Sequence, residues 1–300
     1  MPERDLSEVM KEIRRSVIGH EGHAMSEINK KYAEGLDELR NVIRKKFDEY
    51  AVDGKLTYEK MVKYDRVKKL DKELAKAVRS MHVEVSKLTR AELRDIYRQT
   101  FDKTRSAFEQ AAGRTIRGKI KQEVVTEALQ MPVSGLTLND RLRHRRQGII
   151  TDIQETIGQG LYHGESYSEM SQRLKESLEG DTEKARRIVR TESHRVMEKS
   201  KADTAEYASN QGVEMKKYWL SADDERVRGT PGGKYEDAKA NHSSHGGMGE
   251  RYSKENAIPV DEDFVNPETG GEGPAPGQLG TAEDDINCRC VSVYIVVTED

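Results

Sequence analysis

The residues with the most chemical capability lie near the end of the chain. Cys288 and Cys290 are its two cysteines, one residue apart, and His242 and His245 precede them. Two thiolates and two imidazoles form one of the usual ligand sets of closed, tetrahedral structural zinc sites. These four residues are therefore candidate zinc ligands, and the sequence indicates no other cofactor. The tight Cys-x-Cys spacing and the distant histidines favour the other interpretation, in which both cysteines are small buried hydrophobic side chains at the start of a strand.

A thiol hydrolase is a second chemistry that the same region could support. Asp224, His242 and Cys288 have the residue types of a carboxylate, a base and a nucleophile. No motif of the sequence indicates an oxyanion hole, and Cys288 precedes a predicted strand rather than a helix whose dipole would favour its thiolate. Arg226 and Arg228 instead suggest that Asp224 belongs to an ion-pair network. We therefore predict no catalytic residues and no enzyme.

The composition favours long helices over one broad core. Hydrophobic residues make up 34% of the chain and charged residues 35%, a balance suited to helices that bury narrow apolar seams. No apolar run approaches the roughly 18 residues that span a bilayer, and the start lacks the apolar core of a signal peptide. We expect a non-secreted protein with reduced thiols and no membrane anchor.

Two amphipathic helices are predicted in the first third of the chain. Apolar residues at spacings of three and four run through 28–50 and again through 67–88. The dipeptide Asp53-Gly54 between them is a turn signal. The pattern predicts an antiparallel helical hairpin, with a dimeric coiled coil as the alternative. Residues 89–92, Thr-Arg-Ala-Glu, have the form of a capping box and predict the start of a third helix.

The chain changes character at the loop 132–139, where we place a domain boundary. Residues 1–131 are predicted to form a helical, coiled-coil-like domain, and residues 132–300 a second module. This module begins with helices over 140–210 and continues with a small sheet and loops over 213–298. The fold class is therefore α+β but mostly α: an elongated N-terminal helical hairpin or bundle, then a small, loop-rich α+β module.

Local signals predict where the elements of the second module end. Gly158 and Gly160 are expected to end or loosen the helix that starts near Asp140. Asp181 or Thr182 is expected to cap a later helix.

Two stretches near the C-terminus have the composition of strands. Residues 213–220 include Tyr218 and Trp219, and residues 290–297 are rich in valine. If these strands pair in an antiparallel sheet, Trp219 comes close to the cysteine pair.

Several short motifs follow one another in the second half of the chain. They are Arg190-Thr191-Glu192, Lys217-Tyr218-Trp219, Asp224-x-Arg226-x-Arg228, a histidine, Pro276-Gly277 and Asn287-Cys288-Arg289-Cys290. This order resembles the C-terminal module of phage Mu F-like head morphogenesis proteins, also called minor head or minor capsid proteins. The resemblance implies that the integrity of the module depends on Arg190, Glu192, Trp219, Asp224, Arg226, Arg228, His242, Asn287, Cys288 and Cys290.

Two of these motifs leave alternatives open. The family pattern places its histidine soon after the Asp-x-Arg-x-Arg segment, whereas His242 follows Arg228 only after an inserted stretch. Either His242 or His245 could therefore take the family position. Arg190 and Glu192 are also residue types that ADP-ribosyl transfer uses. Because such close neighbours in a helix point in different directions, we predict a structural role for them instead.

Basic side chains are concentrated in 51–150 and acidic ones in 251–300, which suggests different partners for the two parts. Clustered Lys and Arg can follow a phosphate backbone and bind duplex DNA without sequence specificity. A solvated helix face, or docking onto an acidic protein surface, would explain the same runs. The residues that we predict to contact nucleic acid are Lys68, Lys69, Arg114, Arg117, Lys119, Arg141, Arg143, Arg145 and Arg146.

The resemblance implies a minor structural protein of a tailed-phage head. Such a protein acts in head assembly at the portal vertex and in some cases contacts packaged DNA during packaging or ejection. The implied partners are the portal protein, the inner surface of the major capsid protein, or both, with double-stranded DNA as a further partner. The implied location is the head interior of the virion, and the bacterial host cytoplasm during assembly.

Two other functions stay open beside the structural one. The first is a toxin-like or maturation hydrolase that uses Asp224, His242 and Cys288. The second is a non-specific DNA-binding protein without a role in the head.

Overall fold

The computed structural model describes residues 5–222 and 224–297. The chain forms two compact units, each assembled from separate stretches of sequence. The three longest helices, α1 (Leu6–Tyr50), α3 (Arg66–Ala112) and α6 (Tyr167–Ser209), each supply residues to both units. Unit 1 combines Met1–Gly22, Ala91–Leu138 and Val189–Asp300, and unit 2 combines His23–Arg90 and Asn139–Ile188.

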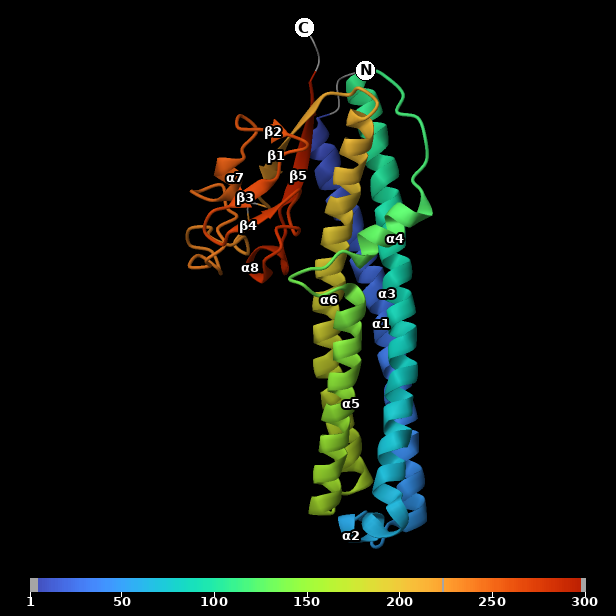
Figure 1. Ribbon diagram of the computed structural model, residues 1–300. Coiled ribbons are helices and arrows are strands. Elements are labelled where there is room, and N and C mark those ends of the chain that lie inside the picture. The colour runs from blue at the N-terminus through green and yellow to red at the C-terminus, as the bar shows by residue number, and fades with distance from the viewer. Residues whose placement is uncertain (1–4, 223, 298–300) are drawn as a thin grey trace. The chain divides into compact units, whose positions relative to one another are not determined.

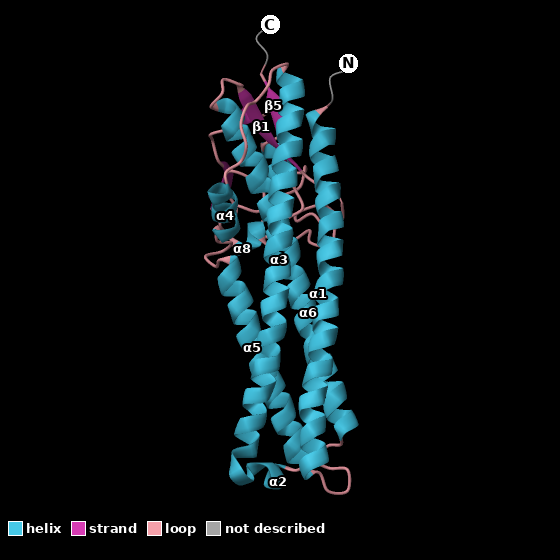
Figure 2. Ribbon diagram, turned by 90° about the vertical axis from the view of Figure 1, so that its right-hand side faces the viewer, coloured by secondary structure: helices cyan, strands magenta, loops and turns pink. Residues whose placement is uncertain are grey.

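Unit 2 is a helical bundle (Figure 2). Its segments come from α1, α3, α5 (Leu138–His163) and α6, and the connection between α1 and α3 contains α2 (Tyr58–Val62) and the 3-10 helix η1 (Lys63–Asp65). Apolar stripes of these helices are buried as their spacing predicts. The buried members include Ile28, Leu39, Ile43, Phe47, Leu70, Leu74, Val78 and Val85.

The predicted hairpin of α1 and α3 is confirmed within unit 2. Lys46 Nζ lies 3.2 Å from Glu73 Oε1, and Gly35 packs against the side chain of Met81. Contacts that move backward along α3 as they move forward along α1 require antiparallel helices. The turn after α1 uses the predicted dipeptide, in which Asp53 and Gly54 both have positive φ.

The helices are more continuous than the capping signals predicted. Residue 89 lies inside α3, where Thr89 Oγ1 donates to the carbonyl of Val85 at 2.8 Å instead of capping a new helix. Thr182 lies inside α6 and bonds the carbonyl of Leu178 in the same way. A threonine hydroxyl inside a helix can donate its hydrogen bond to the carbonyl four residues earlier. The apolar stripe continues through both sites, so each helix continues as well. The predicted caps at these positions were therefore wrong.

The predicted glycine break in α5 was also wrong. Gly158 and Gly160 lie inside α5, which continues to His163. Ile153, Ile157 and Leu161 are all buried along this stretch. Tertiary packing of that stripe outweighs the cost of about 1 kcal/mol that a glycine imposes on a helix interior.

A buried polar cluster lies in the core of unit 2. Asp181, which the sequence suggested as a helix cap, is buried within α6. Its carboxylate accepts a hydrogen bond from Tyr32 Oη at 2.6 Å and forms an ion pair with Arg145. His82 Nε2 lies 3.2 Å from the same carboxylate. Arg145 thus neutralises a buried aspartate, which explains its partial burial without a nucleic acid partner.

Unit 1 joins helical segments to a small sheet. The sheet has the order β2-β1-β5, with β1 antiparallel to both neighbours, and a second antiparallel pair is formed by β3 and β4. The predicted pairing of residues near 213–220 with those near 290–297 is confirmed. The elements are β1 (Met215–Leu220), β2 (Ile258–Pro259), β3 (Phe264–Asn266), β4 (Gly271–Gly273), β5 (Val291–Val296), α4 (Gln122–Gln130), α7 (Met248–Arg251) and α8 (Ala282–Asp285).

Strand β5 lies beside α6 (Figure 1). Buried polar groups attach the two elements to each other. Lys201 Nζ donates to the carbonyl of Ser292 at 2.9 Å, and the Ser292 amide donates to Glu198 Oε2 at 3.0 Å. Lys201 and Glu198 also form an ion pair of 2.5 Å in which both side chains are fully buried. These contacts fix the sheet of unit 1 against α6.

The compact units do not follow the division of the sequence at residue 132. The separation into 1–131 and 132–300 stays a prediction about modules of the sequence. Among the described residues, no helix combines the length and the apolarity needed to cross a bilayer.

We expect acid to weaken unit 2 through His82. Burial, and then the nearby Arg145 and Arg146, lower the pKa of His82 to about 4 from an ordinary value near 6.5. Between these values the unfolded chain binds more protons than the folded one, so stability present at neutral pH is lost as the pH falls through this window. Because glutamine does not titrate, the His82→Gln variant should lose up to about 3 kcal/mol less stability than the wild type over this pH window.

Chemical unfolding followed by the helical circular dichroism signal, from pH 7 to pH 4, measures this difference. His144→Gln is the control because His144 belongs to the same unit but is exposed. It should keep the wild-type pH profile. Parallel profiles for wild type and His82→Gln would contradict the prediction.

Candidate functional site

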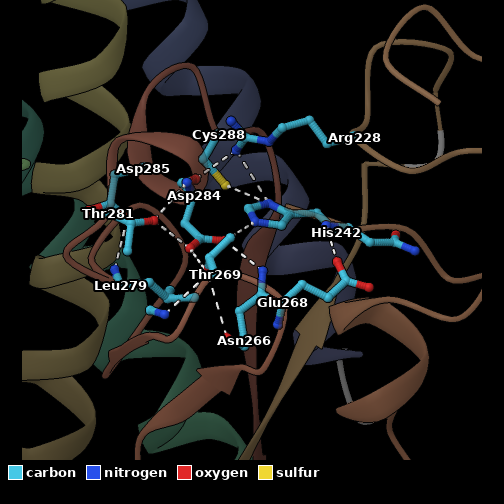
Figure 3. Close-up of polar contacts among 12 residues, drawn as sticks. Arg228, His242, Asn266, Glu268, Thr269, Leu279, Thr281, Asp284, Asp285 and Cys288 are labelled. Carbon is cyan, nitrogen blue, oxygen red and sulfur yellow. Dashed lines mark hydrogen bonds and ion pairs between the residues drawn. The ribbon is translucent and has the colours of Figure 1, made fainter. Parts of the chain in front are cut away.

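The centre of the candidate site is the buried carboxylate of Asp284 in α8 (Figure 3). His242 Nε2 and Asn266 Nδ2 lie 2.8 and 2.7 Å from its Oδ1. The hydroxyl groups of Thr269 and Thr281 donate to its Oδ2 at 2.5 and 2.6 Å. Burial alone would raise the pKa of Asp284, but these side-chain hydrogen bonds, led by that of His242, lower it well below its usual range.

Loops from distant parts of the sequence supply these groups. Asn266 ends β3, and Thr269 belongs to the turn before β4. Thr281 is the N-cap of α8, where its hydroxyl oxygen also accepts a hydrogen bond from the Asp284 amide at 3.2 Å. His242 is held through its amide, which donates to the carbonyl of Arg228 at 2.9 Å. One carboxylate therefore ties together loops that share little apolar core.

Arg228 supports the same centre from the other side. Its guanidinium donates to the carbonyls of Asp284 at 2.6 Å and Ile286 at 3.1 Å. Its Nη2 also lies 3.4 Å from His242 Nδ1. The last arginine of the Asp-x-Arg-x-Arg motif is thus a structural residue that fixes the end of α8.

Asp285, next to Asp284, binds a different part of the chain. Its carboxylate accepts hydrogen bonds from the amides of Leu279 at 2.7 Å and Gly280 at 2.9 Å. Burial raises its pKa to about 6 despite these two bonds. The pair of adjacent aspartates therefore fixes two different loops.

Both cysteines lie beside His242 in the apolar core of the module. Cys288 Sγ is 3.6 Å from His242 Nδ1, and Cys290 Sγ is 3.9 Å from the carbonyl oxygen of His242. The thiols share this core with Trp219, whose ring lies edge-on to His242 at 5.1 Å between centroids. The predicted proximity of Trp219 to the cysteine pair is confirmed.

The two histidines predicted as zinc ligands are placed differently. The ligand atoms of His242, Cys288 and Cys290 lie within 4.8 Å of one another, and all three residues are buried. His245 is exposed, with its ring beside the Ser244 hydroxyl, and does not belong to this group.

The order Asp284, His242, Cys288 resembles the carboxylate, base and nucleophile of a thiol hydrolase. The carboxylate is Asp284, however, and not Asp224 as the hydrolase hypothesis required. Burial raises the pKa of the Cys288 thiol, and this side chain is 2% exposed. A protonated, covered thiol is a poor nucleophile, so this arrangement is suited to structure rather than to catalysis.

Asp224 belongs to an ion-pair network, as its neighbours in the sequence suggested. Its Oδ2 lies 2.5 Å from Arg289 Nη2 and 3.5 Å from Arg226 Nη2. Arg289 stands between the two cysteines, so this pair connects the Asp-x-Arg-x-Arg segment to the terminal motif.

The Arg190-Thr191-Glu192 motif lies in α6, and its members have different environments. Arg190 is exposed, whereas Glu192 is buried and pairs with Arg195 at 2.9 Å. The Asn287 amide donates to Thr191 Oγ1 at 3.4 Å, which joins this motif to the terminal one. Glu192 therefore pairs with Arg195, a residue that we did not predict.

His194 is the site residue that the sequence did not reveal. It lies one turn after Arg190 on α6 and is 1% exposed. Its ring is beside the Cys288 thiol, yet neither ring nitrogen makes a hydrogen bond of ordinary geometry. Burial lowers its pKa, against a smaller opposite effect of the thiol.

Gly277 of the Pro-Gly motif packs against the His194 ring. It has φ of +78°, and a Cβ at this position would lie 2.9 Å from His194 Cδ2. Glycine is therefore required both by the backbone conformation and by the close approach. This contact joins residues far apart in the sequence, so no local sequence pattern predicts it.

The predicted nucleic acid contacts are divided between exposed and internally bonded residues. Arg145 pairs with Asp181, and Arg143 lies 2.8 Å from Asp140. Arg114 donates to the carbonyls of Gly212 and Gln211, which closes the end of α6. Arg141 also has an internal partner, and Arg146 is half-buried. The exposed members without such a role are Lys68, Lys69, Arg117 and Lys119.

Comparisons with known proteins identify the class of this chain. The family model for Phage Mu protein F like protein matches residues 151–293, which include His194, His242, Asp284 and both cysteines. The chain is 31% identical over 297 residues to the minor head protein GP7 of Bacillus phage SPP1, covering 99% of this chain and 89% of that protein. The chain therefore belongs to the Mu F-like family of phage minor head proteins, as its motif order predicted.

A second relative is an enzyme. The chain is 28% identical over 177 residues to the NAD(+)–arginine ADP-ribosyltransferase EFV of Enterococcus faecalis. The match covers 59% of this chain but only 32% of that enzyme, so it extends over a minor part of the larger protein. No solved structure matches the chain.

We expect the two arginines of the Asp-x-Arg-x-Arg motif to differ in their effect on stability. Arg228→Ala removes two charge-assisted hydrogen bonds to partly buried carbonyls and should lower the free energy of unfolding by about 3 kcal/mol. Arg226→Ala is the matched control, because its side chain is 55% exposed and its ion pair is long. It should cost less than about 0.5 kcal/mol.

Urea unfolding followed by the fluorescence of Trp219 measures both values. This tryptophan lies in the core beside His242 and reports on the same module. Equal losses in the two variants would contradict the structural role assigned to Arg228.

Proposed function

We propose that the protein acts in phage head assembly at the portal vertex, as an adhesive and non-catalytic component. The observation that carries this proposal is the similarity to minor head protein GP7 along nearly the whole chain. The candidate site supports it, since its carboxylate is saturated with hydrogen bonds and its thiols are covered. The surfaces that bind the portal protein or the inner face of the major capsid protein then lie outside this site.

We propose further that double-stranded DNA is bound by the segment 113–121 of unit 1, which we call the basic segment. Arg117, Lys119 and Lys121 are exposed along it, while Ile116 is buried and anchors it. Cations without a buried acidic partner suit phosphate contacts, which position a protein on DNA without reading its sequence.

The backbone of the basic segment is held firmly by its neighbours. The Arg117 amide donates to Gln211 Oε1 at 2.9 Å, and Tyr207 Oη donates to the Arg117 carbonyl at 2.5 Å. Arg105 donates to the carbonyl of Gly118 at 2.7 Å. A pinned backbone loses little conformational entropy when its side chains bind phosphate, which favours binding.

We expect the triple variant Arg117→Gln, Lys119→Gln, Lys121→Gln to bind duplex DNA more weakly than wild type. The slope of log affinity against log salt concentration should become shallower by about 0.9 for each phosphate that the variant no longer neutralises. Fluorescence anisotropy with a labelled duplex of mixed sequence, at several salt concentrations, measures this slope.

The matched control removes the same charge from lysines elsewhere on the surface. Lys30, Lys31 and Lys87 each form an ion pair with a glutamate one turn away. The corresponding triple glutamine variant should keep the wild-type slope. Equal slopes for all three proteins would contradict a DNA role for the basic segment.

The head role is tested on particles. Quantitative mass spectrometry of purified phage, referenced to the major capsid protein, should find this chain at a few to some tens of copies. Absence from both immature and mature particles would refute the structural role, and the hydrolase and free DNA-binding hypotheses would then come first.

A further inference from the structure

The spacing of three buried side chains fits a metal ion. Zinc–sulfur bonds of about 2.3 Å and zinc–nitrogen bonds of about 2.05 Å place two ligands of a tetrahedral site about 3.6 Å apart. Cys288 Sγ and His242 Nδ1 are separated by 3.6 Å. Cys290 belongs to the same group, whose ligand atoms all lie within 4.8 Å.

His242 is oriented for ligation through Nδ1. Its Nε2 is 2.8 Å from the Asp284 carboxylate, which cannot donate at neutral pH and therefore requires the proton to be on Nε2. The lone pair of Nδ1 then faces the thiols. A metal-bound histidine typically donates its other ring N–H to a carboxylate in this manner.

Arg228 places a cation close to this lone pair, with Nη2 at 3.4 Å from Nδ1. The same nitrogen donates to the Asp284 carbonyl at the much shorter distance of 2.6 Å. The guanidinium therefore keeps its main partners when Nδ1 binds a metal, and the Asp284 carboxylate lies nearby to balance its charge.

His194 approaches the Cys288 sulfur from α6. Its ring nitrogens lie outside the group of three residues whose ligand atoms are all within 4.8 Å of one another, so zinc binding would draw the ring toward His242 and Cys290. His194 is buried, and apart from the neighbouring Cys288 thiol neither ring nitrogen has a hydrogen-bond partner of ordinary geometry among the described residues. Burying an imidazole with so weak a partner is costly, and packing of the cysteines as hydrophobic side chains leaves that cost unexplained. A metal ion bound by a ring nitrogen of His194 would supply a strong partner and remove this cost. The Pro276-Gly277 turn packs directly on this ring and limits its freedom.

We propose that His194, His242, Cys288 and Cys290 hold one structural zinc ion, with His194 in place of the exposed His245. Two thiolates and two neutral imidazoles give a neutral complex with Zn²⁺, which is compatible with a buried site. Binding releases the two thiol protons to solvent, and no redox step is involved. With four protein ligands the site is closed, so the metal stabilises the module and performs no catalysis.

The first test is the metal content of the full-length protein produced in zinc-supplemented medium. Elemental analysis should find one equivalent of zinc per chain after exhaustive dialysis. Replacement by Co²⁺ should give the intense visible bands of tetrahedral cobalt and a thiolate-to-cobalt absorption in the near ultraviolet. Removal of the metal by a chelator should lower the Tm, and added zinc should restore it.

Single substitutions then identify the ligands. His194→Gln, His242→Gln and Cys290→Ser should each weaken zinc binding by more than about 100-fold in competition with a chromophoric chelator, since loss of a supporting partner alone costs 10- to 100-fold. His245→Gln is the matched control, another loop histidine that is exposed, and should bind zinc as wild type does. Circular dichroism establishes that each variant is folded.

Each outcome decides the proposal. Zinc-free wild type, or cobalt-loaded protein without thiolate absorption, overturns it independently of how the variants fold. Wild-type affinity in folded His194→Gln, or a loss in His245→Gln as large as in His242→Gln, overturns the assignment of His194 as the fourth ligand. The presence of the protein in phage heads is a separate measurement, so the two proposals fail separately.

Discussion

The module at the C-terminal end depends on one buried negative charge. Asp284 is fully buried, and its two oxygens receive hydrogen bonds from four side chains of three loops. A buried carboxylate is stable only if such donors replace the water that it loses. The four donors in turn share Asp284 as a common acceptor, in addition to backbone contacts such as that of the His242 amide with Arg228. This shared acceptor lets long loops with few apolar residues adopt one structure, which a hydrophobic core of this size would not specify alone.

The helical segment 189–209 of α6 contacts the terminal motif and the sheet of unit 1 through buried polar side chains. Glu192 pairs with Arg195, and Glu198 with Lys201, all of them buried. Each pair is three residues apart, but Glu192 and Lys201 are separated by about two and a half turns and lie on opposite sides of the helix. Residues 191–198, 200 and 201 are all buried, so α6 is enclosed on more than one side here. Thr191 contacts the terminal motif at Asn287, and Lys201 contacts β5 at Ser292. Replacing one member of such a pair leaves an uncompensated buried charge, which is far more costly than the net stabilisation that the intact pair provides.

The sequence predicts what depends on local pattern and misses what depends on approach in space. The stripes over 28–50 and 67–88 predict the hairpin because burial of an apolar face repeats at the helical period. The helix caps predicted at Thr89 and Asp181 were wrong because residue types that cap helices also occur inside them. Thr89 bonds the preceding turn of α3, and Asp181 pairs with Arg145. Motif order indicates His242 and both cysteines. Nothing local distinguishes Asp284 from Asp285, or marks His194, since their roles are set by loops distant in sequence.

A module fixed in this way has little freedom to change shape around a ligand, so its contacts with other head components fall on its surface. The basic segment shows how such a surface can be fixed to the same scaffold. Tyr207 and Gln211, at and just beyond the end of α6, hold the backbone at Arg117. Thr191 and His194, earlier on the same helix, contact the terminal motif. One helix therefore positions both the buried cluster and the exposed cations. Loss of the cluster would loosen the support of α6, whereas loss of the cations would leave the fold intact. The stability of the chain and the DNA affinity proposed for the basic segment are therefore separable.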